Sequence, residues 1–207
     1  MPATSLQSGL LGRRAAFLLP LALPLSLPVG LIACGRSQSS RDFPPPRYGA
    51  LPPIQLNVAT IDVVARFAPL GVPPDVSAAS PLRPIEELRR LGQERLTAIG
   101  NEGRVVFAIQ DAALLRQGDV ITGRMAVVLE IMSPANERVG FAEARVSHRV
   151  TGRVEDLRAT LYDMTKAMLD EMNTEVEYQV RRHLRDWLTP PNASTGPVEQ
   201  TPLGRAR

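Results

Sequence analysis

The chain has 207 residues, of which 44% are hydrophobic, 22% charged and 4% aromatic. This composition excludes a wholly disordered chain, and so few aromatic residues do not favour a surface that stacks bases or sugars. The formal net charge is +3, but residues 1–33 hold two of the 24 basic residues and no acidic one, so 22 basic and 21 acidic residues remain without them. That balance does not predict a nucleic-acid partner. One Cys and two His exclude an intrachain disulfide and a Cys- or His-rich metal site, so we predict no metal and no cofactor.

Residues 1–33 have the layout of an export signal. Arg13 and Arg14 end a basic segment, and residues 15–33 are 19 consecutive uncharged residues. A basic segment followed by an apolar one and small residues is typical of a secretory signal peptide. A run of this length also spans a bilayer, which leaves a membrane anchor as the alternative. Three prolines in the run favour the cleaved signal, because each removes a backbone donor and disturbs a helix.

Leu31, Ile32, Ala33 and Cys34 resemble the lipobox of exported bacterial lipoproteins. The resemblance implies cleavage before Cys34, a diacylglycerol on its thiol and an acyl chain such as palmitate on the new amino group. Gly35 follows, and the absence of Asp at this place implies the outer rather than the inner membrane of a Gram-negative envelope. Two or more acyl chains hold a protein stably at a membrane. We therefore expect a lipid-anchored domain at the periplasmic face.

Arg13, Arg14 and Phe17 also resemble a twin-arginine export motif, with one residue more before Phe17 than that motif has. An ordinary basic segment, recognised by the general export route, is the alternative.

The rest of the chain divides by composition into three parts. Residues 34–53 are rich in proline, which favours an extended spacer that holds a domain roughly tens of Å from the bilayer. A ligand for a proline-recognising module is the alternative. Residues 189–207 hold few large apolar residues and are predicted to be disordered. Residues 54–188 suffice for one domain with its own core.

Hydrophobic periodicity predicts six elements in this domain. In chain order they are a strand over 54–67 with a bulge, a helix over 84–100, strands over 104–115, 121–132 and 138–150, and a helix over 154–188. The strand over 138–150 alternates most regularly, so it has one wet face and favours antiparallel neighbours. The order β-α-β-β-β-α predicts an α+β fold, a two-layer sandwich with helices on one face of a mostly antiparallel sheet.

The length of the last helix predicts an exposed apolar surface. Its 35 residues reach about 50 Å, whereas a strand of ten residues covers about 33 Å. We therefore expect the helix either to break or to overhang the sheet, in which case residues 176–188 are the exposed apolar surface. The proline-rich loop over 68–83 and this overhang together would form an apolar groove for acyl chains or a partner helix.

The residues that most often carry catalysis have no convincing arrangement in this chain. His148 falls on the apolar side of its strand, where a hydrogen-bonded core histidine is commoner than a catalytic one. The carboxylates Asp62, Asp111 and Glu130 have no spacing that pairs them. The chain contains no Gly-x-Ser-x-Gly, phosphate-binding glycine loop or His-Glu-x-x-His. We therefore predict a protein that is not an enzyme.

A basic cluster and a methionine stripe on the last helix are candidate contact surfaces. Arg181, Arg182 and Arg185 suit lipid headgroups or a partner protein, because a guanidinium binds phosphate in a forked geometry. A solvated helix end is the alternative, because basic residues also suit the C-terminal end of the helix dipole. A stripe of methionines is either an adaptable binding surface or ordinary core; it consists of Met164, Met168 and Met172.

The lipid anchor and element order over residues 34–188 resemble the auxiliary lipoproteins of ABC-type lipid transporters of the Gram-negative envelope. The resemblance implies a non-catalytic binding or assembly role, with the membrane and an envelope protein complex or lipid as partners. A lipid or lipopolysaccharide carrier that uses the groove is the alternative. An envelope hydrolase built around His148 is a third hypothesis.

Overall fold

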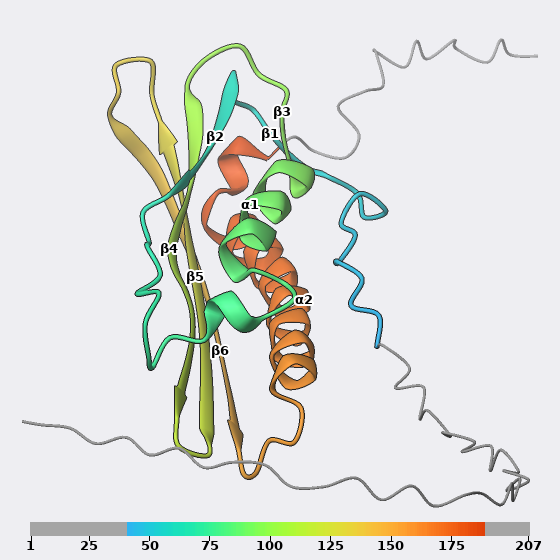
Figure 1. Cartoon of the computed structure of the whole chain (residues 1–207). Helices are drawn as coiled ribbons and strands as arrows, with labels where there is room; N and C mark the ends of the chain where they lie inside the picture. Colours follow the sequence, from blue (N-terminus) through green and yellow to red (C-terminus); the bar gives the residue numbers. More distant parts are fainter. Residues whose placement is uncertain (1–40, 189–207) are drawn as a thin grey trace, which may run out of the picture. The chain divides into compact units, whose positions relative to one another are not determined.

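The computed structural model describes residues 41–188, which form two helices, α1 and α2, on one face of a four-stranded sheet (Figure 1). The elements are β1 (Ile54–Leu56), β2 (Thr60–Ala65), α1 (Pro84–Arg95), β3 (Leu96–Ala98), β4 (Arg104–Gln117), β5 (Val120–Met132), β6 (Arg138–Thr151) and α2 (Leu157–His183), with 3-10 turns at Ser77–Ala79 and Arg185–Trp187. The predicted α+β class, with helices covering one face of the sheet, is confirmed.

The main sheet has the strand order β2-β4-β5-β6. β4, β5 and β6 are joined by hairpins and pair antiparallel, whereas β2 pairs parallel with β4. Phe107, Leu129 and Ala142 lie side by side in this register and are fully buried beneath the helices. A register shift between Ile109 and Asp111 marks a β-bulge in β4. The mostly antiparallel sheet therefore matches the prediction.

The predicted strand over 54–67 is two strands that belong to different sheets. β1 pairs parallel with β3 in a separate two-stranded sheet, and β2 joins the main one. The change in alternation therefore marks a change of sheet, not a bulge within one strand. The chain between them passes close to Gly100, where a Cβ would lie 2.7 Å from the backbone of Asn57 and Val58. Only glycine fits there without moving backbone atoms.

The predicted helix over 84–100 ends earlier, at Arg95. Pro84 occupies its first turn, followed by Glu86 and Glu87, as expected for residues at the positive end of a helix dipole. Residues 96–98 leave the helix because they pair with β1 instead. A strand of three residues has too few alternating positions for hydrophobic periodicity to predict it.

The predicted overhang of the last helix is wrong. α2 has 27 residues, or about 40 Å, and β5 and β6 have 13 and 14, or about 43 to 46 Å. The strands are longer than the ten residues assumed, so the sheet extends under the whole helix. Val176, Val180 and Leu184 are completely buried, and a Cβ on Gly140 of β6 would lie 3.0 Å from Leu184. These residues belong to the core.

Residues 41–53, which we call the strap, pack on the domain rather than extending away from it. Tyr48 is only 3% exposed, and the rings of Phe43 and Tyr162 lie 5.0 Å apart. The Tyr162 hydroxyl donates to the Pro44 carbonyl at 2.8 Å. The described part of the predicted spacer is therefore part of the folded unit, which begins before Ile54.

Candidate functional site

The lipobox residues Leu31, Ile32, Ala33 and Cys34 lie outside the described residues, so the lipid anchor stays a prediction. The predicted disordered segment, 189–207, also lies outside them. Between residues 41 and 188, no helix has both the length and the apolar character needed to cross a membrane.

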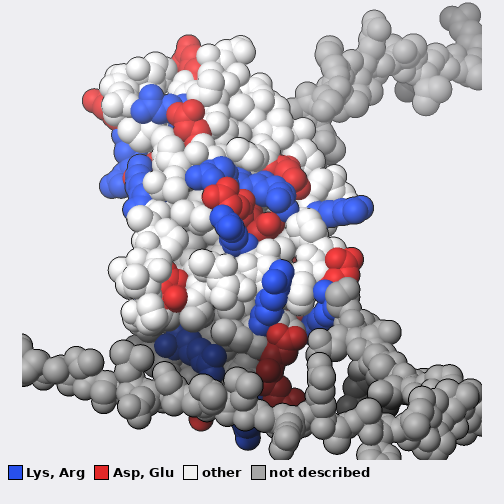
Figure 2. All heavy atoms as spheres, in the orientation of Figure 1, with Lys and Arg blue, Asp and Glu red and all other residues white. Residues whose placement is uncertain are grey.

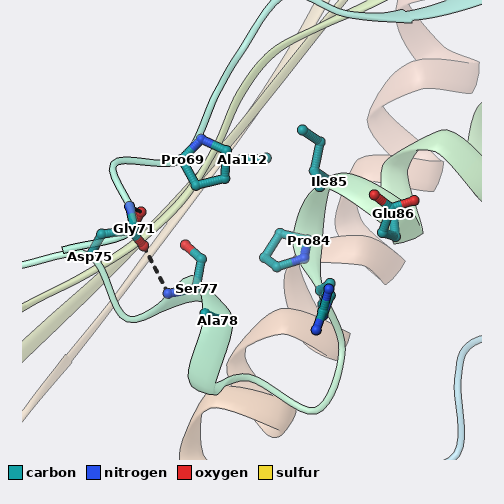
Figure 3. Close-up of a pocket in the computed structure, with 10 residues that line it drawn as sticks. Pro69, Gly71, Asp75, Ser77, Ala78, Pro84, Ile85, Glu86 and Ala112 are labelled. Atoms are coloured by element: carbon teal, nitrogen blue, oxygen red, sulfur yellow. Dashed lines mark hydrogen bonds between the residues drawn. The ribbon is translucent and has the colours of Figure 1, made fainter.

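The loop over 68–83 forms a pocket of about 220 Å³ against the start of α1 (Figure 3). Its lining comes from the loop, from the first turn of α1 and from β4, and comprises Pro69, Gly71, Asp75, Ser77, Ala78, Arg83, Pro84, Ile85, Glu86 and Ala112. Pockets for drug-sized ligands are about 300 to 1,000 Å³. This pocket therefore has room for a small apolar group and not for an acyl chain.

Asp75 fixes the shape of this loop. Its carboxylate accepts hydrogen bonds from the backbone N–H groups of Ser77, at 2.8 Å, and Gly71, at 3.2 Å. Burial raises the pKa of Asp75, but the bonds from the Ser77 hydroxyl and these N–H groups outweigh it and hold the pKa below its ordinary value. Ser77 Oγ also accepts from the Leu114 N–H at 2.9 Å. The Leu114 bond ties the loop to β4, whereas the bond between Asp75 and the Ser77 N–H, dashed in Figure 3, lies within the loop.

The pocket does not join the last helix into the predicted apolar groove. None of its lining residues comes from residues 176–188, whose apolar residues Val176, Val180 and Leu184 are buried in the core instead. The loop does reach α2, but through a buried contact of 3.2 Å between Ser80 and Thr165 in the N-terminal half of the helix. The pocket of the loop and the surface of residues 176–188 lie on different parts of the domain, so the predicted groove is not formed.

The pocket brings together few groups that could act chemically. Among its lining residues only Asp75, Glu86, Arg83 and Ser77 carry reactive or charged side chains. The Ser77 hydroxyl already bonds to Asp75 and to the Leu114 N–H, and the lining contains no His, Cys or Lys. A serine held in this way serves loop structure.

His148 lies on the inner side of β6, as the alternation predicts, but at the rim of the helix–sheet interface. Its side chain is 35% exposed, and Nε2 lies 2.7 Å from a carboxylate oxygen of Glu171 on α2. The histidine thus links β6 to α2 from the edge of the core. The second histidine, His183, is exposed at the end of α2.

The other candidate residues of the sheet and helix have structural contacts. Asp62, Asp111 and Glu130 lie apart on the outer face of the sheet, where each pairs with arginine. The methionine stripe is core, because Met164, Met168 and Met172 are nearly or wholly buried. Within residues 41–188, no group of three or more His, Cys, Asp or Glu side chains is placed to hold a metal ion.

The basic cluster at the end of α2 is exposed to solvent. Arg181 pairs with Glu177 at 2.8 Å, and Arg182 donates to the Tyr178 hydroxyl at 2.9 Å. Arg185 is exposed in the following 3-10 turn. Their contact with a headgroup or partner stays a prediction.

On the face shown in Figure 2, basic and acidic side chains lie next to each other, as in the ion pairs of α1.

The residues that dock the strap on the domain were not among those predicted from the sequence. Arg95 is 2% exposed and donates to Asn173 at 2.6 Å, to Glu177 at 2.7 Å and to the Pro52 carbonyl. It therefore ties the strap to α1 and α2. The available signal was the pair of aromatic residues, Phe43 and Tyr48, within an otherwise polar and proline-rich segment, because a free spacer has no need of them.

Comparisons with known proteins find weak structural similarities, among them three to solved structures. No family model matches the chain, and no curated protein matches it. A protein of Caulobacter crescentus CB15 with a provisional lipoprotein name is 14% identical, with a TM-score of 0.36 over 59% of this chain and 88% of that one. A minor lipoprotein of Acinetobacter baumannii is 10% identical, with a TM-score of 0.36 over 66% of this chain and 99% of that one.

The third similar structure is uncharacterized lipoprotein B of Nitrosomonas europaea, 14% identical, with a TM-score of 0.30 over 62% of this chain and 83% of that one. All three names contain the word lipoprotein. At these identities and scores the similarities do not carry a function across to this chain. The assignment as a lipoprotein therefore rests on the residues around Cys34.

Proposed function

We propose that this protein is a membrane-anchored lipoprotein of the periplasmic face, with a non-catalytic role in binding or assembly. The observation that carries the proposal is the lipobox-like sequence ending in Cys34, at the end of an apolar export signal. An anchor of two or more acyl chains keeps a folded domain at a membrane without a spanning helix. Gly35 after the cysteine supports the outer membrane as its location.

The contacts of the described residues support binding rather than catalysis. Ser77 and His148, which are of the types most often used in catalysis, are engaged in loop structure and in the link between β6 and α2. The pocket of about 220 Å³ beside Asp75 is too small for an acyl chain, which disfavours a carrier that uses this pocket. The exposed end of α2, with Arg181, Arg182 and Arg185, is the surface we assign to a partner protein.

We further propose that this partner belongs to a lipid-transport assembly of the envelope. A photo-crosslinking residue in place of Arg182 tests it in native membranes, with one in place of Arg145 on the outer face of the sheet as the control. We expect an adduct at position 182 that mass spectrometry identifies as a component of such an assembly, and none at position 145.

Lipid analysis of the purified protein distinguishes this assembly role from that of a lipid or lipopolysaccharide carrier. We expect organic extraction to release no acyl chains beyond those attached to Cys34. Stoichiometric free lipid, without a protein adduct at position 182, would replace the assembly role by the carrier role.

A further inference from the structure

The strap restricts how far the domain can lie from its predicted anchor. Arg41 contacts Asp163 of α2 at 2.5 Å, so the folded unit extends at least to Arg41. Seven residue steps separate Cys34 from Arg41, and at about 3.5 Å for each step they span at most about 25 Å. The 20 steps from Cys34 to Ile54 would span about 70 Å. Docking of the strap therefore shortens the reach of the anchor to about a third.

With so short a reach, we expect the end of the domain at which α2 begins to lie nearer to the membrane. Asp163 is the seventh residue of α2, and His183 lies 20 residues further, which is about 30 Å along the helix axis. The turn between β5 and β6 lies at the same end as the C-terminus of α2, far from the strap's first residues (Figure 1). A membrane within about 25 Å of Arg41 thus meets the opposite end first.

A hollow with two arginines lies at that end. It has a volume of about 530 Å³ and lies between residues 78–81 with Arg83 on one side and Leu157 with Arg158 on the other. Both arginines are exposed, and neither has a carboxylate within 4.0 Å among the described residues. The lining itself contains no acidic residue. The hollow is therefore electropositive.

The strap and the hollow are physically connected. The Arg158 guanidinium lies over the Phe43 ring at 5.6 Å, and that of Arg41 lies over the same ring at 5.8 Å. Asp156, the residue that precedes α2, caps the helix by accepting from the Ala159 N–H at 2.9 Å. Arg158 is thus held at the point where the strap meets α2, beside the exit of the chain toward Cys34.

We infer that this hollow docks on phospholipid headgroups of the leaflet that holds the anchor, with Arg83 and Arg158 contacting phosphate. The inference rests on the proposed lipid modification of Cys34. A guanidinium donates two parallel hydrogen bonds to phosphate, and an arginine near an anionic membrane surface shifts the ratio of docked to undocked protein by about fivefold. The domain then lies with the start of α2 toward the bilayer and the end of α2 away from it.

Energy transfer from a fluorophore to acceptor-labelled lipid headgroups tests this orientation. The full-length lipidated protein is reconstituted in vesicles of equal parts phosphatidylethanolamine and phosphatidylglycerol. One label is attached at Thr151→Cys, at the end of β6 from which the chain leads into α2, and one at Ala135→Cys in the turn between β5 and β6, both exposed positions. We expect markedly higher transfer from position 151, and equal transfer from both positions overturns the inference.

Charge reversal tests the two arginines. We expect Arg83→Glu with Arg158→Glu to abolish the difference between the two labels. Arg182→Glu with Arg185→Glu makes the same change in charge at the other end of α2 and should leave the difference intact. A loss in this second variant and not in the first would contradict the assignment of the hollow.

Mass spectrometry of the same sample separates this inference from the proposed function. A protein without acyl chains on Cys34 overturns the proposed function, and the docking that rests on it. A lipidated protein that shows equal transfer from both labels overturns only the docking. A Phe43→Ala variant, which loosens the strap, should reduce the difference between the labels while Cys34 stays acylated.

Discussion

The two faces of the main sheet are protected from water in different ways. Leu129 points to the inner face and is covered by the helices, and Val128, the next residue, points to the outer face and is only 5% exposed. No helix covers the outer face within the described residues. There, small apolar residues lie among long arginine and glutamate side chains, whose aliphatic stems cover apolar surface. The inner face therefore holds the fold together. The outer face is a solvated surface on which some apolar side chains are shielded from water by their longer neighbours.

The largest effect is expected from Leu129→Ala on the inner face. Leu129 is fully buried between Phe107 and Ala142, so the substitution leaves a cavity and should cost about 3 kcal/mol in the free energy of unfolding. Urea denaturation followed by circular dichroism measures the loss. Val128→Ala is the matched control on the outer face and should cost less than half as much. Equal losses would show that the two faces are packed alike.

The next largest effect is expected from Arg95→Met, on the helix side of the sheet. Arg95 is nearly completely buried, and its loss leaves Asn173 and the Pro52 carbonyl without their donor. We expect a cost of about 2 kcal/mol and faster proteolysis within the strap. Arg89→Met, which removes an exposed partner of Glu86, is the control and should change stability little. A strap that resists proteolysis in the Arg95 variant would contradict its role.

A smaller, pH-dependent effect is expected from Glu130→Gln on the outer face. Hydrogen bonds from Arg66 and Arg138 hold the pKa of Glu130 below its ordinary value, against a weaker opposite effect of burial. A carboxylate with a lowered pKa in the folded state contributes stability above about pH 4.3, and this stability is lost as the pH falls through the folded-state pKa. The variant should lose about 1 kcal/mol at neutral pH and less in acid. Urea denaturation at neutral and acidic pH checks this, and an equal loss at both would contradict it.

The smallest effect is expected from Arg145→Ala. This side chain is 72% exposed and pairs with Glu143 at 2.5 Å on the outer face. Exposed ion pairs contribute about 0 to 1 kcal/mol, so thermal unfolding should shift hardly at all. A loss as large as that of Leu129→Ala would mean that the ion pairs, and not the helices, hold the sheet.

The predictions from the sequence succeeded where periodicity is long and regular. The strands over 104–115, 121–132 and 138–150 agree within two residues with β4, β5 and β6, because many apolar residues alternate there. β1 and β3 have three residues each, too few to alternate detectably. Their pairing depends on a contact between distant parts of the chain, which no local pattern encodes.

The candidate sites were less predictable than the fold. The overhang of the last helix was inferred from an assumed strand length, and the longer strands removed it. The strap could not be recognised as docked because its contacts, such as Phe43 with Tyr162 and Pro52 with Arg95, join residues far apart in sequence. Arg83 and Arg158 likewise meet in one hollow only through the fold.

The central claim is tested most directly by labelling cells with radioactive palmitate. The account predicts that the wild-type protein takes up the label and that Cys34→Ser, which replaces sulfur by oxygen at one atom, accumulates as an unlabelled full-length precursor. Equal labelling of both proteins, or no labelling of the wild type, would contradict the assignment as a lipid-anchored protein.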